Sequence, residues 1–299
     1  GCARLALTDA DKEGRDLVGR WMRDLGLDVS VDAVGNVFAV REGAEDVAPV
    51  MMGSHIDTVR TGGRYDGNLG VLAGLELCAA LDRAGLRTRR PLAVAYFTNE
   101  EGARFQPDML GSLVAVGGLP LDEAYAARSI DGKTLGAELD RIGYRGPHAP
   151  GFLKPHAFVE LHIEQGPILE AEGVTIGAVT GVQGISWNEY ALSGVSNHAG
   201  TTPMRLRRDA GYAAMAIAAG IRDIAKRIGG DQVGTVGRIE LVPNLINVVA
   251  SRATFTVDLR NTDETVLREA EVQAASLIER VCAAENVGIE RRTLARFEP

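Results

Sequence analysis

The sequence predicts an α/β protein that carries a second, smaller α+β domain. Two observations lead to this fold class. Over residues 1–183, short β-rich apolar runs alternate with helical segments, which is typical of a mixed, mostly parallel sheet. From about Gly184 the order becomes strand–helix–strand–strand–helix–strand, the split βαβ pattern. We therefore expect a first domain at residues 1–183, an inserted domain at 184–296, and the start of a return to the first domain at 297–299.

The first domain should open with a helix over Asp9–Leu25, because Leu17, Trp21 and Leu25 recur at helical spacing. The stretch LDVSVDAVGNVFAVRE then alternates apolar and polar residues, which predicts a hairpin that turns at Gly35. Its other expected elements are strands at Val50–Gly53, Leu92–Phe97 and Ala157–Ile163 and a helix at Leu69–Leu81.

The last of these strands is expected to place Glu160, His162 and Glu164 on one face, because side chains alternate along a strand with a period of two. The inserted domain is expected to contain strands at Ile185–Gly194, Thr235–Val242, Val248–Leu259 and Val287–Leu294 and helices at Leu206–Ile228 and Glu264–Ala284.

Composition narrows the class of protein. A net charge of -8 with no offsetting basic stripe argues against a general nucleic-acid binder. Cys2, Cys78 and Cys282 are an odd number of distant cysteines without CxxC spacing, which favours reduced thiols in a cytoplasmic protein. No apolar run is long enough to span a bilayer, and the N-terminus has no signal-peptide pattern, so no membrane partner is expected.

Candidate metal ligands follow the expected strands of the first domain. His55 follows one strand, Glu100 and Glu101 follow a second, His162 lies near the end of a third, and Asp66 lies on the Gly-rich loop after His55. Ligands of open α/β sheets bind at the carboxyl ends of the strands, so these side chains should converge. Imidazole and carboxylate ligands together suit Zn²⁺, Mn²⁺ or Co²⁺, and a carboxylate can bridge two ions.

Each of these residues alone has an ordinary structural explanation. A histidine after a strand is more often structural than a ligand, an aspartate in a Gly-rich turn is usually a turn residue, and adjacent glutamates are usually solvated. Their joint occurrence at successive strand ends favours a metal site. His148 and His156 lie in a Pro-rich loop and are interpreted as loop residues.

Six segments in order resemble the consecutive motifs of one group in the M20 metallopeptidase-like superfamily. That group comprises the N-carbamoyl-L-amino-acid hydrolases, with β-ureidopropionase and allantoate amidohydrolase as close relatives. The resemblance extends over nearly the whole chain. The segments are GSHIDTVRTGGRYDGNLGVLAGLE, FTNEEGARF, ELHIEQGPILE, SNHAGTTPM, PNLINVVA and DLRN.

The resemblance implies a metallopeptidase-like catalytic domain, a lid and dimerisation domain, and a centre of two divalent ions, Zn²⁺ or Mn²⁺, with Co²⁺ or Ni²⁺ as alternatives. His55 and His162 would bind the first ion, Asp66 would bridge both, and Glu101 would bind the second. Asp57 would hydrogen-bond the other ring nitrogen of His55.

The resemblance also implies how the reaction and the substrate are handled. Glu100 would be the general base that moves the proton of the attacking water. Asn247 and Arg260 would grip the substrate carboxylate, with Gln165 nearby, because the planar fork of arginine suits a carboxylate. His198 would reach the active site of the neighbouring subunit in a homodimer and stabilise the oxyanion.

Alternatives remain for these residues and for the function. Arg260 could instead form a salt bridge at a strand end, and His198 could be an exposed loop histidine. The expected activity is hydrolysis of the ureido amide of an N-carbamoyl-L-amino acid; the alternatives are an allantoate amidohydrolase, an aminoacylase or peptidase of the same superfamily, or a non-catalytic relic. The family's last metal ligand is a histidine in a Gly-rich motif near the C-terminus, and this chain ends before such a motif, since no histidine follows His198. We expect either that the C-terminal part of the catalytic domain is missing and the chain binds metal poorly, or that the second ion is bound by fewer ligands.

Overall fold

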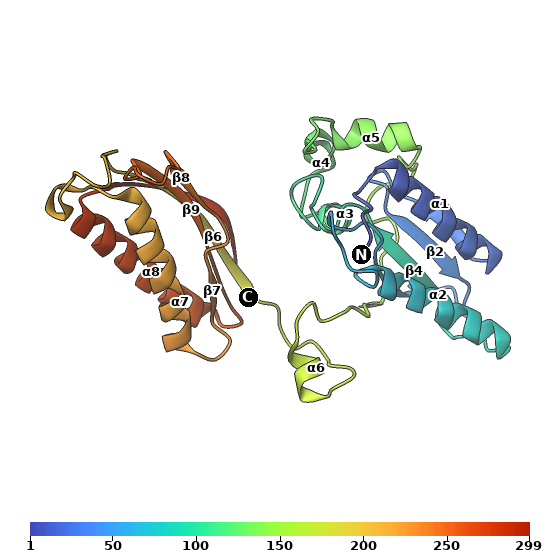
Figure 1. Ribbon diagram of the computed structural model, residues 1–299. Coiled ribbons are helices and arrows are strands. Elements are labelled where there is room, and N and C mark those ends of the chain that lie inside the picture. Colours follow the sequence, from blue (N-terminus) through green and yellow to red (C-terminus); the bar gives the residue numbers. More distant parts are fainter. The chain divides into compact units, whose positions relative to one another are not determined.

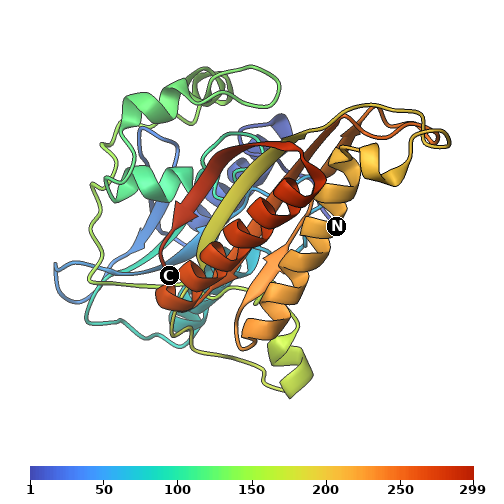
Figure 2. The same ribbon diagram turned by 90° about the vertical axis from the view of Figure 1, so that its left-hand side faces the viewer.

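The computed structural model describes residues 1–299 and divides the chain into two compact units, Gly1–Thr175 and Ile176–Pro299. The division lies before the predicted boundary at residue 184, and the predicted return at 297–299 lies within the second unit. No helix in either unit is both long and apolar enough to cross a membrane. Both units appear in Figures 1 and 2.

The first unit contains a five-stranded mixed sheet with helices α1 and α2 packed against it (Figure 1). The strand order is β1-β2-β4-β3-β5; β3 pairs in parallel with β4 and with β5, while the other two pairings are antiparallel. Its elements are α1 (Asp9–Asp24), β1 (Asp28–Val31), β2 (Val37–Arg41), β3 (Val50–His55), α2 (Asn68–Arg83), β4 (Leu92–Phe97), α3 (Leu110–Ala115), α4 (Leu121–Ala126), α5 (Leu135–Ile142), β5 (Ala157–Val159) and α6 (Ile168–Glu172).

The predicted helix at the N-terminus, the hairpin and the three strand positions of this unit are confirmed. The strand predicted at Ala157–Ile163 is shorter, because it pairs with β3 only as far as Val159. Because the pairing ends at Val159, Glu160, His162 and Glu164 do not continue one strand face. The carboxylate of Glu164 instead accepts hydrogen bonds from the amides of Ile168 and Leu169 in the first turn of α6. The helices α3, α4, α5 and α6 were not predicted.

The second unit is an antiparallel sheet covered on one face by two helices that lie side by side (Figures 1 and 2). The strand order is β10-β6-β9-β7, and β8 also pairs with β9. Its elements are β6 (Gly184–Ser193), the 3₁₀ turn η1 (Met204–Leu206), α7 (Ala210–Ile228), β7 (Val233–Thr235), β8 (Ile239–Val242), β9 (Arg252–Asn261), α8 (Glu264–Glu285) and β10 (Gly288–Phe297).

This order confirms the predicted α+β arrangement of strands and helices. The structure differs from the prediction in where individual elements begin and end. The strand predicted at Thr235–Val242 is two short strands, β7 and β8. Helix α7 begins at Ala210 rather than at Leu206, because the Asp209 carboxylate accepts from the amide of Tyr212 and caps its first turn. The alternation in β9 places Phe255, Val257 and Leu259 in the core under the helices.

Candidate metal centre

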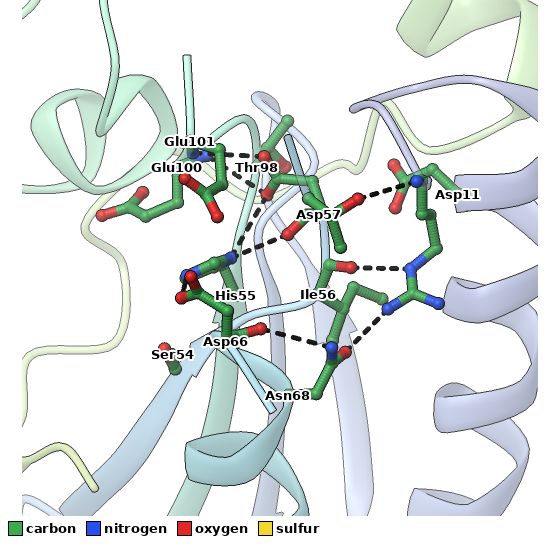
Figure 3. A network of polar contacts seen from close by, with 12 residues as sticks. Asp11, Ser54, His55, Ile56, Asp57, Asp66, Asn68, Thr98, Glu100 and Glu101 are labelled. Carbon is green, nitrogen blue, oxygen red and sulfur yellow. Dashed lines mark hydrogen bonds and ion pairs between the residues drawn. The ribbon is translucent and has the colours of Figure 1, made fainter. Parts of the chain in front are cut away.

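The central strands of the first sheet bring the predicted ligands to one edge. His55 is the last residue of β3, and Glu100 and Glu101 follow the end of β4, its parallel neighbour. His162 follows β5, the parallel neighbour on the other side. Because parallel strands end at the same edge of a sheet, residues from three distant segments meet there. Figure 3 shows His55, Glu100 and Glu101 of this group.

His55, Asp66 and His162 form a cluster that could hold a metal ion. Their ligand atoms all lie within 4.8 Å of one another. Asp66 Oδ1 lies 3.7 Å from His55 Nε2 and 3.3 Å from His162 Nε2. The loop needs a glycine at position 67, where φ is +68° and an added Cβ would lie 2.4 Å from the His55 ring.

The two histidines are held by main-chain oxygens at the nitrogen that faces away from Asp66. His55 Nδ1 lies 2.9 Å from the carbonyl oxygen of Asp57, and His162 Nδ1 lies 2.8 Å from the carbonyl oxygen of Ile163. A proton on each Nδ1 leaves each Nε2 lone pair free to bind a cation. The Asp57 carboxylate is farther from His55 Nδ1, at 4.0 Å, so the expected contact is made by the Asp57 backbone.

The Asp57 carboxylate has another function in this structure. Its two oxygens accept hydrogen bonds from the amides of Glu100 and Glu101, both at 3.2 Å (Figure 3). Asp57 is fully buried, and burial raises the pKa of its carboxyl. Through these bonds Asp57 ties the loop after β3 to the turn after β4.

Glu100 and Glu101 each bring a buried carboxylate oxygen that has no protein partner, Oε2 of Glu100 and Oε1 of Glu101. The other oxygen of Glu100 accepts from the hydroxyl of Ser112 at 2.6 Å. Burial raises the pKa of Glu100 to about 7, against the opposing effect of the Ser112 hydrogen bond. Burial also raises the pKa of Glu101, and the nearby Asp66 carboxylate adds to this effect.

These features fit a divalent cation. Buried carboxylate oxygens without partners are costly unless a proton or a cation satisfies them. The donors that meet here are imidazole nitrogens and carboxylate oxygens, the set that suits borderline divalent ions. Gln165 also lies at this edge, where its side-chain amide donates to both oxygens of Asp66 at 3.1 and 2.9 Å.

Within the second unit, the structure brings His198 and Asn247 together. Their segments pair antiparallel: the Ala199 amide donates to the Asn247 carbonyl at 2.9 Å, and the Val249 amide donates to the Asn197 carbonyl at 2.9 Å. The His198 ring accepts from the Gly200 amide at 3.1 Å.

Arg260 lies at the opposite end of β9. The Asn247 segment leads into the Arg252 end of this strand, and the eight residues from there to Arg260 span about 26 Å at about 3.3 Å per residue. The Arg260 guanidinium binds the Asp258 carboxylate, with Nη2 3.0 Å from Oδ2, and lies over the Trp187 ring. The salt-bridge alternative therefore describes Arg260 in this structure, and Asn247 lies beyond the other end of the strand.

Two contacts of the site were not predicted from the sequence. Ser112 reaches Glu100 from the unpredicted helix α3, and Arg4 contacts the loops that carry His55 and Asp66. Both contacts join segments distant in sequence, and no local spacing signals them. His148 stacks on Phe152 in its loop, with ring centroids 4.5 Å apart, and has no place in the cluster.

Comparison with known proteins agrees with this geometry. The model of peptidase family M20/M25/M40 matches residues 51–294. N-carbamoyl-L-amino-acid amidohydrolase of Rhizobium meliloti is 43% identical over all of this chain and 72% of that protein, and the protein of the same name from Geobacillus stearothermophilus is 40% identical over all of this chain and 74% of its own length. The crystal structure of a hydantoinase/carbamoylase family amidase from Burkholderia ambifaria is 48% identical, with a TM-score of 0.92 over all of this chain and 74% of that one. The chain belongs to peptidase family M20/M25/M40.

Proposed function

We propose that this protein is a metal-dependent amidohydrolase that cleaves the carbamoyl amide of N-carbamoyl-L-amino acids. The observation that carries the proposal is the cluster of His55, Asp66 and His162 beside the two buried, unpartnered oxygens of Glu100 and Glu101. The similarity to proteins named N-carbamoyl-L-amino-acid amidohydrolase supports the substrate class. Hydrolysis would consume water and release the free amino acid, ammonia and carbon dioxide.

Two divalent ions, Zn²⁺ or Mn²⁺ with Co²⁺ or Ni²⁺ as alternatives, would be held by residues of the first unit. His55 and His162 would bind one ion, Glu101 the other, and Asp66 both. Divalent ions at such a site polarise the scissile carbonyl and lower the pKa of water. The backbone carbonyls of Asp57 and Ile163 keep the two imidazoles in the tautomer that binding requires.

Glu100 is the residue we assign to proton transfer. Its carboxylate would take a proton from the attacking water and give it up to the leaving nitrogen, a task that suits a carboxyl whose pKa burial raises. The Ser112 hydroxyl holds one oxygen and leaves the other without a protein partner. The Asp57 carboxylate positions the Glu100 backbone.

Substrate binding would use residues of both units and of two chains. Arg260 would bind the substrate carboxylate through its planar fork, in competition with Asp258, and Gln165 would contribute from the first unit. His198 and Asn247 would come together from the partner subunit of a homodimer, with His198 stabilising the oxyanion. The position of Asn247 beyond the Arg252 end of β9, with Arg260 near the other end, supports this division.

The substrate class is tested with a panel on the purified chain reconstituted with Mn²⁺ or Zn²⁺, with metal per chain measured by elemental analysis. N-carbamoyl-L-amino acids are compared with their D enantiomers, N-acetyl-L-amino acids, dipeptides and allantoate, and ammonia and amino acid are both measured. We expect one tightly bound ion, a second that fills at higher metal concentration, and the fastest hydrolysis for the L-carbamoyl compounds. Preferential hydrolysis of acetyl compounds or dipeptides would reject the carbamoyl assignment.

Replacing Arg260 by alanine should raise KM for N-carbamoyl-L-amino acids about 10–100-fold with a smaller effect on kcat, because a charge-assisted bidentate contact contributes about 1.5–3 kcal/mol. The measurement is steady-state kinetics with a carboxylate substrate and with its neutral amide. The matched control is Asp258→Asn, which frees the guanidinium and should lower KM or leave it unchanged. An unchanged KM for Arg260→Ala would remove Arg260 from the substrate site.

Two inactive variants should restore each other if His198 acts in the partner's site. A His198→Ala chain keeps Glu100, and a Glu100→Gln chain supplies His198, so each hybrid dimer regains one complete site. Random exchange at equal amounts makes half of the dimers hybrid, so activity should recover to about one quarter of the parental value. A mixture no more active than its components would place His198 in the site of its own chain or outside the site altogether.

A further inference from the structure

The segment that precedes α1 pairs with the loop that joins β3 to α2. The amide of Cys2 donates to the Gly62 carbonyl at 3.0 Å, and the amide of Gly62 donates back to the Cys2 carbonyl at 2.9 Å. The Thr58 amide donates to the Arg4 carbonyl at 2.8 Å, and the Arg4 amide donates to the Thr58 hydroxyl at 2.7 Å. This loop follows His55 and carries Asp66, so the N-terminal segment contacts the loop that holds one metal-ligand candidate and follows another.

The Arg4 side chain joins the two ends of that loop. Its Nε donates to the carbonyl of Ile56, the residue after His55, at 2.6 Å. Its Nη2 donates to the side-chain oxygen of Asn68 at 2.7 Å. Asn68 in turn donates to the Asp66 carbonyl from its backbone amide at 2.7 Å and from its side chain at 3.2 Å. Figure 3 labels the residues that these contacts join, Ile56, Asp66 and Asn68, beside His55.

The chemistry of these contacts requires an arginine. A guanidinium presents donors in a fixed planar fork, so it can hold a carbonyl and an amide oxygen at a set separation, whereas a lysine ammonium is a single flexible point. Both acceptors, the Ile56 carbonyl and the Asn68 side-chain oxygen, are neutral. The stem is also confined, because an added Cβ at Gly14 of α1 would lie 3.0 Å from Arg4 Cδ.

We propose that Arg4 is a positioning residue of the metal centre. It holds the Asp66 backbone at a set distance from the end of β3, so that the Asp66 carboxylate and the His55 imidazole face one ion. The proposal rests on the metal site proposed above and adds a residue that touches neither metal nor substrate. Outer residues that orient metal ligands typically change metal affinity about 10–100-fold.

The test is Co²⁺ binding by the full chain, measured by competition with a chelator and by the visible d–d spectrum of the bound ion. We expect Arg4→Met and Arg4→Lys to weaken Co²⁺ binding about 10–100-fold and to change the spectrum, since lysine keeps the charge without the fork. Asn68→Ala should act in the same direction, and the double variant Arg4→Met/Asn68→Ala should be no worse than Arg4→Met alone.

Arg41→Met is the matched control. Arg41 also bridges a side chain and a carbonyl, with Nε 2.8 Å from Asp82 Oδ1 and Nη2 2.7 Å from the Leu86 carbonyl, at the far end of α2. It should keep parental Co²⁺ affinity and spectrum. The unfolding temperature of each metal-free variant separates lost ligand geometry from lost stability.

Three results would overturn the positioning role. Parental Co²⁺ affinity in Arg4→Met would remove Arg4 from the centre, and an equal loss in Arg41→Met would show a general loss of stability. If Arg4→Met does not fold, parental affinity and spectrum in Asn68→Ala have the same consequence. A parental chain that binds no Co²⁺ would instead overturn the proposed metal site itself.

Discussion

Replacing Glu100 by glutamine is expected to lower turnover about 10²–10⁴-fold while metal and substrate binding persist. The amide is nearly isosteric with the carboxylate, so Ser112 can still contact it and the Asp57 bond to the backbone is unaffected. Only the ability to take and return a proton is lost. Turnover is measured by ammonia release, metal content by elemental analysis, and substrate affinity by calorimetry on the inactive variant.

Glu160→Gln is the matched control for that experiment. Glu160 is the residue after β5, and its carboxylate accepts a hydrogen bond from the Ser54 hydroxyl. We assign it no role in proton transfer. It should retain turnover within a few-fold of the parental protein. An active Glu100→Gln protein would reject the proton-transfer role. If Glu100→Gln instead binds no metal, Glu100 would be a metal ligand and not the proton-transfer group.

Replacing Asp66 by asparagine is expected to abolish measurable metal binding and, with it, the stabilisation that metal gives to the folded protein. Asp66 is the side chain that faces both histidines, and a neutral amide cannot supply the anionic oxygen between them. A ligand present at 100 times its Kd stabilises the native state by about 2.7 kcal/mol. Thermal unfolding with and without Mn²⁺ should therefore show an upward shift in the parental chain and none in Asp66→Asn.

Asp82→Asn provides the comparison, since Asp82 is a carboxylate of α2 that pairs with Arg41 away from the cluster. Mn²⁺ should raise the unfolding temperature of Asp82→Asn by as much as it raises that of the parental chain, even if the metal-free variant unfolds at a different temperature. A metal-dependent shift of parental size in Asp66→Asn would mean that the stabilising ion binds elsewhere.

Much of the fold could be predicted because local signals and tertiary packing agree. Helix α1 begins after Thr8, whose hydroxyl accepts from the Asp11 amide, and its apolar face packs on the sheet. Strand β4 has the predicted bounds, since an apolar run between turn residues suits a strand with neighbours on both sides. The helices α3 to α6 were missed, because five to eight residues are too few to form a helix without tertiary contacts.

The sequence by itself predicted which candidate site residues lie at one edge of the sheet. His55, Glu100 and Glu101 follow parallel neighbouring strands, and such strands end at one edge whatever the loops do. The resemblance to carbamoyl hydrolases likewise depends on the order of the motifs along the chain, which the sequence alone shows.

Only the tertiary structure decided how those candidate residues are held. It assigns the His55 contact to the Asp57 backbone, gives the Asp57 carboxylate to the amides of Glu100 and Glu101, and brings Arg4 across the loop. It also separates Asn247 from Arg260 along β9. The physical reason is that hydrogen bonds depend on angles and distances of a few tenths of an ångström between segments distant in sequence, whereas side-chain periodicity and motif order are local properties of the chain.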